Sequence, residues 1–548
     1  MVSLLFISGC GGATSGDGHI YFTPTPFPSF TPTPTPTVAP IPIPDDWGAT
    51  TDNLKIVGKI TYDRVPVNSD GIGLDYNSIR QEPSKQIIVK LVKDSCAITR
   101  QDEVIASTMT NNSGEYEFNN LPKNQNARIC VYAQMKKDGS SGWDLEVVDN
   151  TNNDALYIMQ SGLFSTGEVS MRRNLNASSG WNGNRYSSTR TAAPFAILGS
   201  MYQAMQKVTY ADSKVNFPKL KINWSVDNVP AGSGDEAGLK KGQIITSHYD
   251  GDGNLYILGD ANTDTDEYDD HVIIHEWGHY FEDKFSRADS IGGPHGDGNR
   301  LDIRVAFGEG WGNAWSAIAT DNPIYFDTQG YRQSDGFSMN IESEPSIISG
   351  WYSEASVQHI LYDLYDIHDD GADTLALGFK PIYKVLVGFQ KNTKAFTSIF
   401  TFITGLQSEN PSISTEIDNI LASEDISHIY NIYGSTQNDL YSDMVQGEAE
   451  VCTSNRYGVI NKLDNHKYIR FSINRSGTYK ISVVQNNGSS SDPDFGVYKT
   501  TPFEHIGDSD SSTFGKESAE YDLSAGEYLL DVGDYNGVKY ACFDVTIN

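Results

Sequence analysis

The chain has 548 residues, of which 38% are hydrophobic and 11% aromatic, enough apolar side chains for several packed domains and too many for wholesale disorder. Its 71 Asp and Glu residues against 40 Lys and Arg give a net charge of -31, which repels phosphate backbones and excludes binding of nucleic acid through a basic face. No apolar run reaches the length of about 18 residues that a membrane-spanning helix needs.

The first ten residues form a short apolar stretch that ends in Ser8-Gly9-Cys10. This ending resembles the lipobox of bacterial lipoprotein signals, which implies cleavage before Cys10 and attachment of lipid to it, although no Lys or Arg precedes the apolar run. The alternative is an ordinary apolar N-terminus with a chance cysteine. Residues 11–50 are a Thr/Pro-rich linker, and because proline fixes φ and lacks an amide donor, we expect an extended stalk.

Residues 51–150 show short apolar alternations between turn residues, which predict a small antiparallel β-sandwich with strands at 55–60, 86–92, 116–118 and 128–132. Segment 112–122 resembles the turn and strand of carboxypeptidase-regulatory-like domains, which serve as spacers or contact surfaces. Cys96 and Cys130 lie close together in this module and predict a disulfide made in an oxidising compartment, with buried free thiols as the alternative.

Between residues 151 and 446 the helical period takes over. The pattern predicts helices at 192–208, 272–285, 305–318 and 353–365, and strands at 220–224 and 254–258. Strands combined with a run of helices in this way indicate an α+β domain.

This central segment contains His275-Glu276-Trp277-Gly278-His279. Positions i and i+4 share one helix face, so both imidazoles can bind one Zn²⁺ while Glu276 projects beside them. A catalytic zinc takes three protein ligands and a water, and Glu309 follows His279 by 30 residues, a gap that permits a second helix to return to the metal. The alternative is two surface histidines on an ordinary helix.

Segment Gly308-Glu309-Gly310-Trp311, together with 273–276 and 360–364, resembles the gluzincin peptidases, thermolysin-like and especially fungalysin-like. The resemblance implies a zincin-type fold with His275, His279 and Glu309 as the metal ligands. In these families the position four residues after the Glu ligand is usually Asp, which orients a metal histidine. Here it is Asn313, which can accept a hydrogen bond but carries no charge.

The activity that the resemblance implies is metal-assisted hydrolysis of a peptide bond, with Glu276 as the general base that passes a proton from water to the leaving amine. The oxyanion needs a donor besides the metal, and Tyr352 and His359 are the candidates, with packing or capping roles as the alternative for each.

Other polar residues of the central segment carry weaker signals. Segments 250–254 and 260–270 are rich in carboxylates and predict either a Ca²⁺ site, with Asp250, Asp252 and Asp260 as the candidate ligands, or a solvated acidic loop. We interpret the remaining histidines in the region as ordinary polar residues, namely His248, His271 and His295.

Residues 447–548 form a second strand-rich block. It resembles the bacterial pre-peptidase C-terminal β-sandwich in three short segments, Gly477-Thr478-Tyr479, Asp492-Pro493-Asp494 and Gly526-Glu527-Tyr528. Cys542 on its last strand can reach Cys452 at its start, which predicts a second disulfide.

The sequence therefore predicts a multidomain protein in which an α+β zincin-type metallopeptidase domain is flanked by two antiparallel β-sandwich domains. We expect a monomeric zinc metalloendopeptidase outside the cytoplasm, secreted or touching a bacterial membrane only through its lipid anchor, with protein or peptide substrates. The alternative is a surface binding or adhesion lipoprotein whose peptidase-like domain is inactive.

Overall fold

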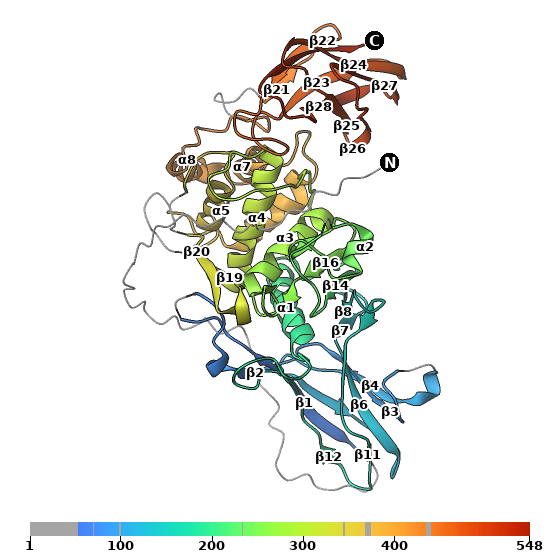
Figure 1. Cartoon of the computed structure of the whole chain (residues 1–548). Helices are drawn as coiled ribbons and strands as arrows, with labels where there is room; N and C mark the ends of the chain where they lie inside the picture. Colours follow the sequence, from blue (N-terminus) through green and yellow to red (C-terminus); the bar gives the residue numbers. More distant parts are fainter. Residues whose placement is uncertain are drawn as a thin grey trace.

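The computed structural model describes residues 53–548 apart from 70, 98–99, 233, 343–345, 368–373 and 435–439. The expected lipobox at Cys10 and the Thr/Pro-rich linker lie outside these residues. Figure 1 shows the N-terminal sheets (blue) at one end of the molecule, the C-terminal sheets (red) at the other, and the helices between them. Among the described residues, no helix is both long enough and apolar enough to cross a membrane.

The N-terminal module is built from two sheets around β1 (Ile56–Arg64) and β6 (Asn126–Tyr132). The first sheet adds β2 (Arg80–Pro83), β5 (Glu115–Phe118), β12 (Met171–Arg172) and β13 (Leu175–Ala177) to β1. The second adds β3 (Ile88–Val92), β4 (Val104–Met109), β10 (Ile158–Gln160) and β11 (Phe164–Ser165) to β6. The predicted Cys96–Cys130 disulfide is confirmed, and it ties the segment after β3 to β6.

The central sheet has the order β15-β16-β14-β8-β7, with β9 (Ala155–Leu156) beside β8. Its strands are β7 (Gln134–Lys137), β8 (Trp143–Asp149), β14 (Leu220–Trp224), β15 (His248–Tyr249) and β16 (Asn254–Ile257). Strand β8 pairs in parallel with β14, whereas β12 and β13 return to pair with β1. The boundary expected between residues 150 and 151 therefore does not separate the sheets. Strand β8, before it, belongs to the central sheet, and β12 and β13, after it, belong to the N-terminal module.

The helices of the central region are α1 (Ala193–Ala211), α2 (Glu236–Leu239), α3 (Asp270–Phe285), α4 (Ile303–Thr320), α5 (Glu354–Asp363), α6 (Phe379–Val385), α7 (Ile399–Glu409) and α8 (Ser414–Ser423). The helices α1 and α3 contact the central sheet, and the four predicted helices are found as α1, α3, α4 and α5, with further helices beside them. A small sheet, β17-β18-β19-β20, lies beside α3 and α4. It consists of β17 (Gly259–Asp260), β18 (Asp264–Thr265), β19 (Ile324–Gln329) and β20 (Asp335–Asn340).

The C-terminal module is a sandwich of two sheets, ordered β21-β23-β28-β25-β26 and β22-β29-β24-β27, with an apolar cluster of its own. Its strands are β21 (Tyr441–Asp443), β22 (Glu448–Thr453), β23 (His466–Ile473), β24 (Gly477–Gly488), β25 (Pro493–Thr500), β26 (Phe503–Ser509), β27 (Lys516–Leu523), β28 (Gly526–Asp534) and β29 (Ala541–Ile547). The predicted Cys452–Cys542 disulfide is confirmed, and it joins β22 to β29.

A buried charged cluster fixes this sandwich to the start of α4. Arg304 pairs with Asp302, the N-cap of α4, at 2.9 Å and with Asp531 on β28 at 2.7 Å. The hydroxyl of Tyr468 on β23 donates to Asp302 at 2.7 Å. Arg304 thus bridges the two carboxylates, and Nδ1 of His466 on β23 also lies 2.8 Å from Asp531, so both acidic side chains have ionic partners within the interface.

Candidate metal centre

Three glycines let helices α3, α4 and α5 approach one another closely. A Cβ on Gly278 of α3 would lie 3.3 Å from Cα of Gly312 on α4, and the indole of Trp311 donates to the Gly278 carbonyl at 3.0 Å. On the other side of α4, a Cβ on Gly310 would lie 2.6 Å from Val357 of α5. The missing side chains therefore bring α4 within reach of the α3 histidines and of α5.

The three predicted ligands meet in this contact. Nε2 of His275 lies 3.1 Å from Nε2 of His279, and Oε2 of Glu309 lies 3.3 Å and 3.5 Å from these two atoms. His275 is 2% exposed and Glu309 1% exposed. Ligands about 2.1 Å from a tetrahedral zinc are about 3.3 to 3.4 Å apart. The three atoms therefore have the spacing of one face of a tetrahedral zinc site.

Asn313 fixes the orientation of His275. Its Nδ2 donates to Gln358 of α5 at 2.9 Å, so its Oδ1 faces Nδ1 of His275 at 2.8 Å. The imidazole then carries its proton on Nδ1 and leaves the Nε2 lone pair for a metal. Asn313 thus orients His275 through a hydrogen bond. In the families that the sequence resembles, an aspartate has this role.

The carboxylate of Glu309 has the properties of a metal ligand. Both of its oxygens are shielded from solvent without a hydrogen-bond partner. Burial raises its pKa, but the neighbouring His295 and His279 outweigh burial and hold the pKa well below its usual value. An ionised, buried carboxylate with two free oxygens beside two imidazole nitrogens is a donor set that fits Zn²⁺.

Glu276 points from α3 toward the edge of the central sheet. Its Oε2 accepts a hydrogen bond from the backbone N–H of Tyr249 on the edge strand β15 at 3.0 Å. Burial raises the pKa of Glu276 to about 8, opposed by His275 and reinforced by Glu309. The charges of His275 and Glu309 therefore act on this carboxylate, although its hydrogen bond goes to the sheet edge. A pKa near neutral pH suits a general base.

The structure adds His295, which the sequence interpretation treated as an ordinary polar residue. Its Nε2 lies 3.4 Å from Oε2 of Glu309, and its Nδ1 lies 2.8 Å from Oε2 of Glu354 on α5. Burial lowers the pKa of His295, but the charges of Glu309 and Glu354 outweigh burial and raise the pKa to about 9. The residue lies in the loop between α3 and α4, where no periodic pattern marks it.

The two predicted oxyanion donors are held elsewhere by their contacts. The ring of Tyr352 packs under the guanidinium of Arg300, with 4.5 Å from its centroid to the guanidinium carbon. Nδ1 of His359 lies 3.0 Å from Oε1 of Glu424, and its Nε2 is buried without a partner. Within the described ranges, no hydrogen bond or ion pair joins Tyr352 or His359 to the three ligands, and their catalytic role stays a prediction.

The residues predicted to bind calcium belong to separate turns. Asp250 accepts from the backbone N–H groups of Asp252 and Asn254 at 2.8 and 3.0 Å, and Asp260 accepts from that of Asn262 at 2.9 Å. These carboxylates act as turn residues, and their contacts give no support to a shared Ca²⁺.

The other two histidines of this region bind backbone carbonyls. His248 bonds to Thr246 at 2.8 Å and His271 to Asn322 at 3.1 Å. Both therefore behave as the ordinary polar residues that the sequence interpretation takes them to be.

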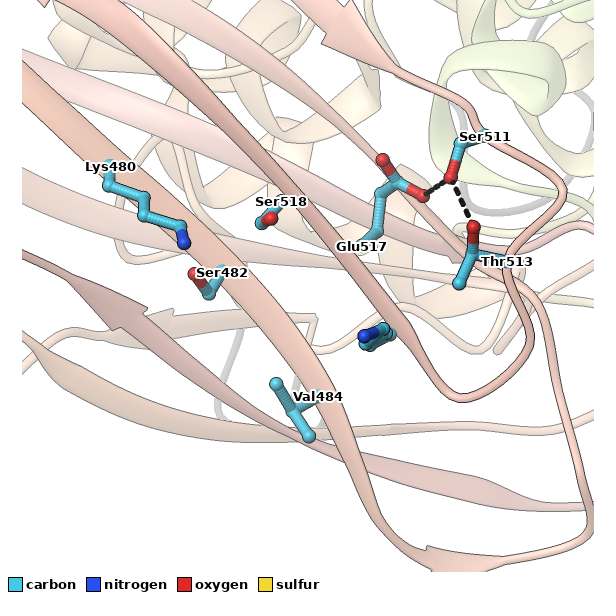
Figure 2. Close-up of a pocket in the computed structure, with 8 residues that line it drawn as sticks. Lys480, Ser482, Val484, Ser511, Thr513, Glu517 and Ser518 are labelled. Carbon is cyan, nitrogen blue, oxygen red and sulfur yellow. Dashed lines mark hydrogen bonds between the residues drawn. The ribbon is translucent and has the colours of Figure 1, made fainter.

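Two surface hollows lie in the C-terminal sandwich. Figure 2 shows the first, of about 290 Å³, between β24 and β27, where the hydroxyl of Ser511 donates to Glu517 at 2.6 Å and lies 3.0 Å from the hydroxyl of Thr513. The second, of about 750 Å³, includes Tyr433 and Arg470 in its lining. Neither hollow is lined by His275, His279 or Glu309.

No protein-family model and no curated protein sequence matches the chain. It is similar to a pre-peptidase C-terminal domain of a collagenase from Bacillus anthracis, with 10% identity over 21% of this chain and 100% of that one and a TM-score of 0.17. It is also similar to CorA, a surface-associated copper-binding protein of Methylomicrobium album BG8, with 9% identity over 20% of this chain and 96% of that one and a TM-score of 0.16.

A third similar structure is PliG, a periplasmic inhibitor of g-type lysozyme from Aeromonas hydrophila, with 16% identity over 20% of this chain and 95% of that one and a TM-score of 0.14. One of the three is thus the type of module that the C-terminal sequence resembles. These low scores carry no argument about function, and the gluzincin core stays a prediction.

Proposed function

We propose that the chain is a zinc metalloendopeptidase that acts outside the cytoplasm, anchored through lipid on Cys10. One observation carries the proposal: Nε2 of His275, Nε2 of His279 and Oε2 of Glu309 converge in a buried site with the mutual distances of tetrahedral zinc ligands. The two disulfides suit an oxidising compartment, which supports the location.

The surrounding residues supply the remaining roles. A zinc ion in such a site lowers the pKa of a water and polarises a carbonyl. Glu276 accepts the proton of the attacking water and returns it to the leaving amine. His295, held through Nδ1 by Glu354, would donate to the oxygen of the scissile carbonyl from Nε2, which has no hydrogen bond and lies 3.4 Å from Oε2 of Glu309. An extended substrate can pair with the edge strand β15, whose Tyr249 already contacts Glu276.

The competing hypothesis is an inactive binding protein with the same fold. A protein without catalysis has no need to keep a general base, three metal ligands and an orienting amide together in one buried site. Their joint presence supports the enzyme over the binding protein.

A peptide-cleavage assay with two variants tests the proposal. The purified chain, loaded with zinc, is incubated with a diverse peptide library and the products are read by mass spectrometry. We expect Glu276→Gln to keep the fold and one zinc per chain but to lose cleavage, and Glu309→Ala to lose the zinc. Full cleavage by Glu276→Gln would refute the mechanism, whereas zinc binding without any cleavage would favour the binding protein.

A further inference from the structure

A second group of carboxylates lies where β18, β19 and the start of α3 meet. Asp264 belongs to β18, Asp266 follows it, and Asp327 lies on β19. One oxygen of each of these three side chains lies within 4.8 Å of the other two. Oxygens on opposite sides of a Ca²⁺ are about 4.8 Å apart, so this spacing fits a single ion.

The neighbouring acidic residues have arginine partners and these do not. Glu267 pairs with the buried Arg190, and Asp270 pairs with Arg64 at 2.7 Å. Across the part of the chain that the structure describes, no Lys, Arg or His forms an ion pair with Asp264, Asp266 or Asp327. The negative charge of this group is therefore left without a compensating side chain.

Asp269, the N-cap residue of α3, adjoins this group, because its backbone N–H donates to the carbonyl of Asp266 at 2.9 Å. It is 1% exposed, and its Oδ2 accepts from the backbone N–H and the hydroxyl of Thr328, both at 2.8 Å. Its Oδ1 is buried without a partner, as is Oδ1 of both Asp264 and Asp327. Three carboxylate oxygens shielded from water with nothing to bind are costly unless a cation completes them.

The electrostatics of the group agree with this geometry. Burial, followed by the charges of Asp266 and Asp327, raises the pKa of Asp269 well above its usual value. Burial, followed by the charges of Asp266, Asp327 and Asp269, raises the pKa of Asp264 to about 11. Burial raises the pKa of Asp266 to about 7. Asp269 thus interacts electrostatically with all three of the other carboxylates. A bound cation would lower the pKa values of these carboxylates and favour their ionised form.

We propose that Asp264, Asp266 and Asp327, with Asp269, form a structural site for Ca²⁺. The donors are all oxygens, which Ca²⁺ prefers, whereas zinc prefers nitrogen and sulfur. An ion there would join β18 and β19 to the first turn of α3, the helix that carries His275 and His279. The site does not depend on peptidase activity, and it differs from the turns at Asp250 and Asp260.

Calcium titration of the full chain tests the site without any substrate. Protein freed of calcium, with zinc held at one buffered concentration, is titrated with Ca²⁺ by calorimetry and with Tb³⁺ by luminescence, and its thermal midpoint is measured with and without Ca²⁺. The test variant is Asp327→Asn. The matched control is Asp252→Asn, the same chemical change on an exposed acidic turn.

We expect one Ca²⁺ site in the wild type and in Asp252→Asn, each with a rise of several degrees in the thermal midpoint, and at least a tenfold loss of Ca²⁺ affinity in Asp327→Asn. Burial and the charge of Asp266 raise the pKa of Asp327 well above its usual value, so without calcium this side chain must take up a proton on folding. Asn has no such cost, so Asp327→Asn should also melt above the wild type when calcium is absent. If the wild type shows neither Ca²⁺ binding nor a thermal shift, the carboxylates share protons and the proposal is wrong. Loss of Ca²⁺ binding in Asp252→Asn alone would also overturn it.

Discussion

A methyl group added at Gly312 tests whether the close contact between α3 and α4 determines the positions of the proposed metal ligands. A Cβ there would lie 2.7 Å from Cε1 of the His275 ring and 2.9 Å from both of its nitrogens. Nonbonded carbon atoms prefer about 3.5 to 4.0 Å, so in Gly312→Ala the ring or the helix must move by about 0.8 Å or more. Metal–ligand distances tolerate only about 0.2 Å.

The expected effect is a loss of metal affinity in a protein that still folds. Displacing the ring also strains its 2.8 Å hydrogen bond to Asn313, and loss of such an outer contact alone costs about 10- to 100-fold in metal affinity. Overpacking costs about 1–3 kcal/mol, partly offset by the better helix propensity of alanine, about 1 kcal/mol. We therefore expect at least a tenfold weaker zinc affinity with a modest change in the free energy of unfolding.

Gly308→Ala is the matched control on the same helix. The nearest atoms to a Cβ there, Oε2 of Glu282 and Cβ of Ser290, lie at 3.5 Å, an ordinary contact. Zinc affinity is measured by competition with a chromogenic chelator, and stability by thermal melting followed by circular dichroism. Gly308→Ala should bind zinc as the wild type does and melt slightly higher. Wild-type zinc affinity in Gly312→Ala would refute the reasoning, as would an equal loss in both variants.

Two further predictions concern residues beside the site. His295→Phe should keep one zinc per chain but lower kcat by about 10²- to 10³-fold with little change in KM, and loss of the zinc instead would identify His295 as a ligand. The carboxylates of Asp302 and Asp531 have pKa values below the usual one, because Arg304 outweighs the effect of burial. Their contribution to stability is complete above about pH 4, the pKa of an unfolded aspartate, and is lost as the pH falls through and below it. Acid should therefore lower the thermal midpoint of the wild type more steeply than that of Arg304→Leu, and equal slopes would contradict this.

Local sequence patterns predicted the parts of the site that depend on helical periodicity. A repeat of 3.6 residues predicts one helix for His275 and His279 and another for Glu309, and both helices are found, as α3 and α4. That the three residues bind a metal stays a prediction. Both disulfides were also predicted from the local grouping of the cysteines. The helices depend on the regular geometry of one element, and each disulfide joins two cysteines of one module, 34 and 90 residues apart.

Features that depend on distant segments were missed. His295 reaches Glu309 because its loop folds back over α4, and a loop conformation has no period to detect. Asp327 joins Asp264 only because β19 pairs with β18 across the length of two helices. Strand β8 lies in the central sheet through parallel pairing with β14, which needs a long connection that no local pattern specifies.

The two helices that carry the proposed metal ligands are both held near their first turns by polar contacts with a neighbouring sheet. Arg304 lies five residues before Glu309, about 7.5 Å along α4, and Asp269 lies six residues before His275, about 9 Å along α3. Arg304 forms an ion pair with Asp531 of the C-terminal sandwich. Asp269 accepts hydrogen bonds from the N–H and the hydroxyl of Thr328 on β19. Because a helix transmits a shift at its start along its axis, the sandwich and the small sheet contribute to where the metal ligands meet, although neither provides a ligand itself.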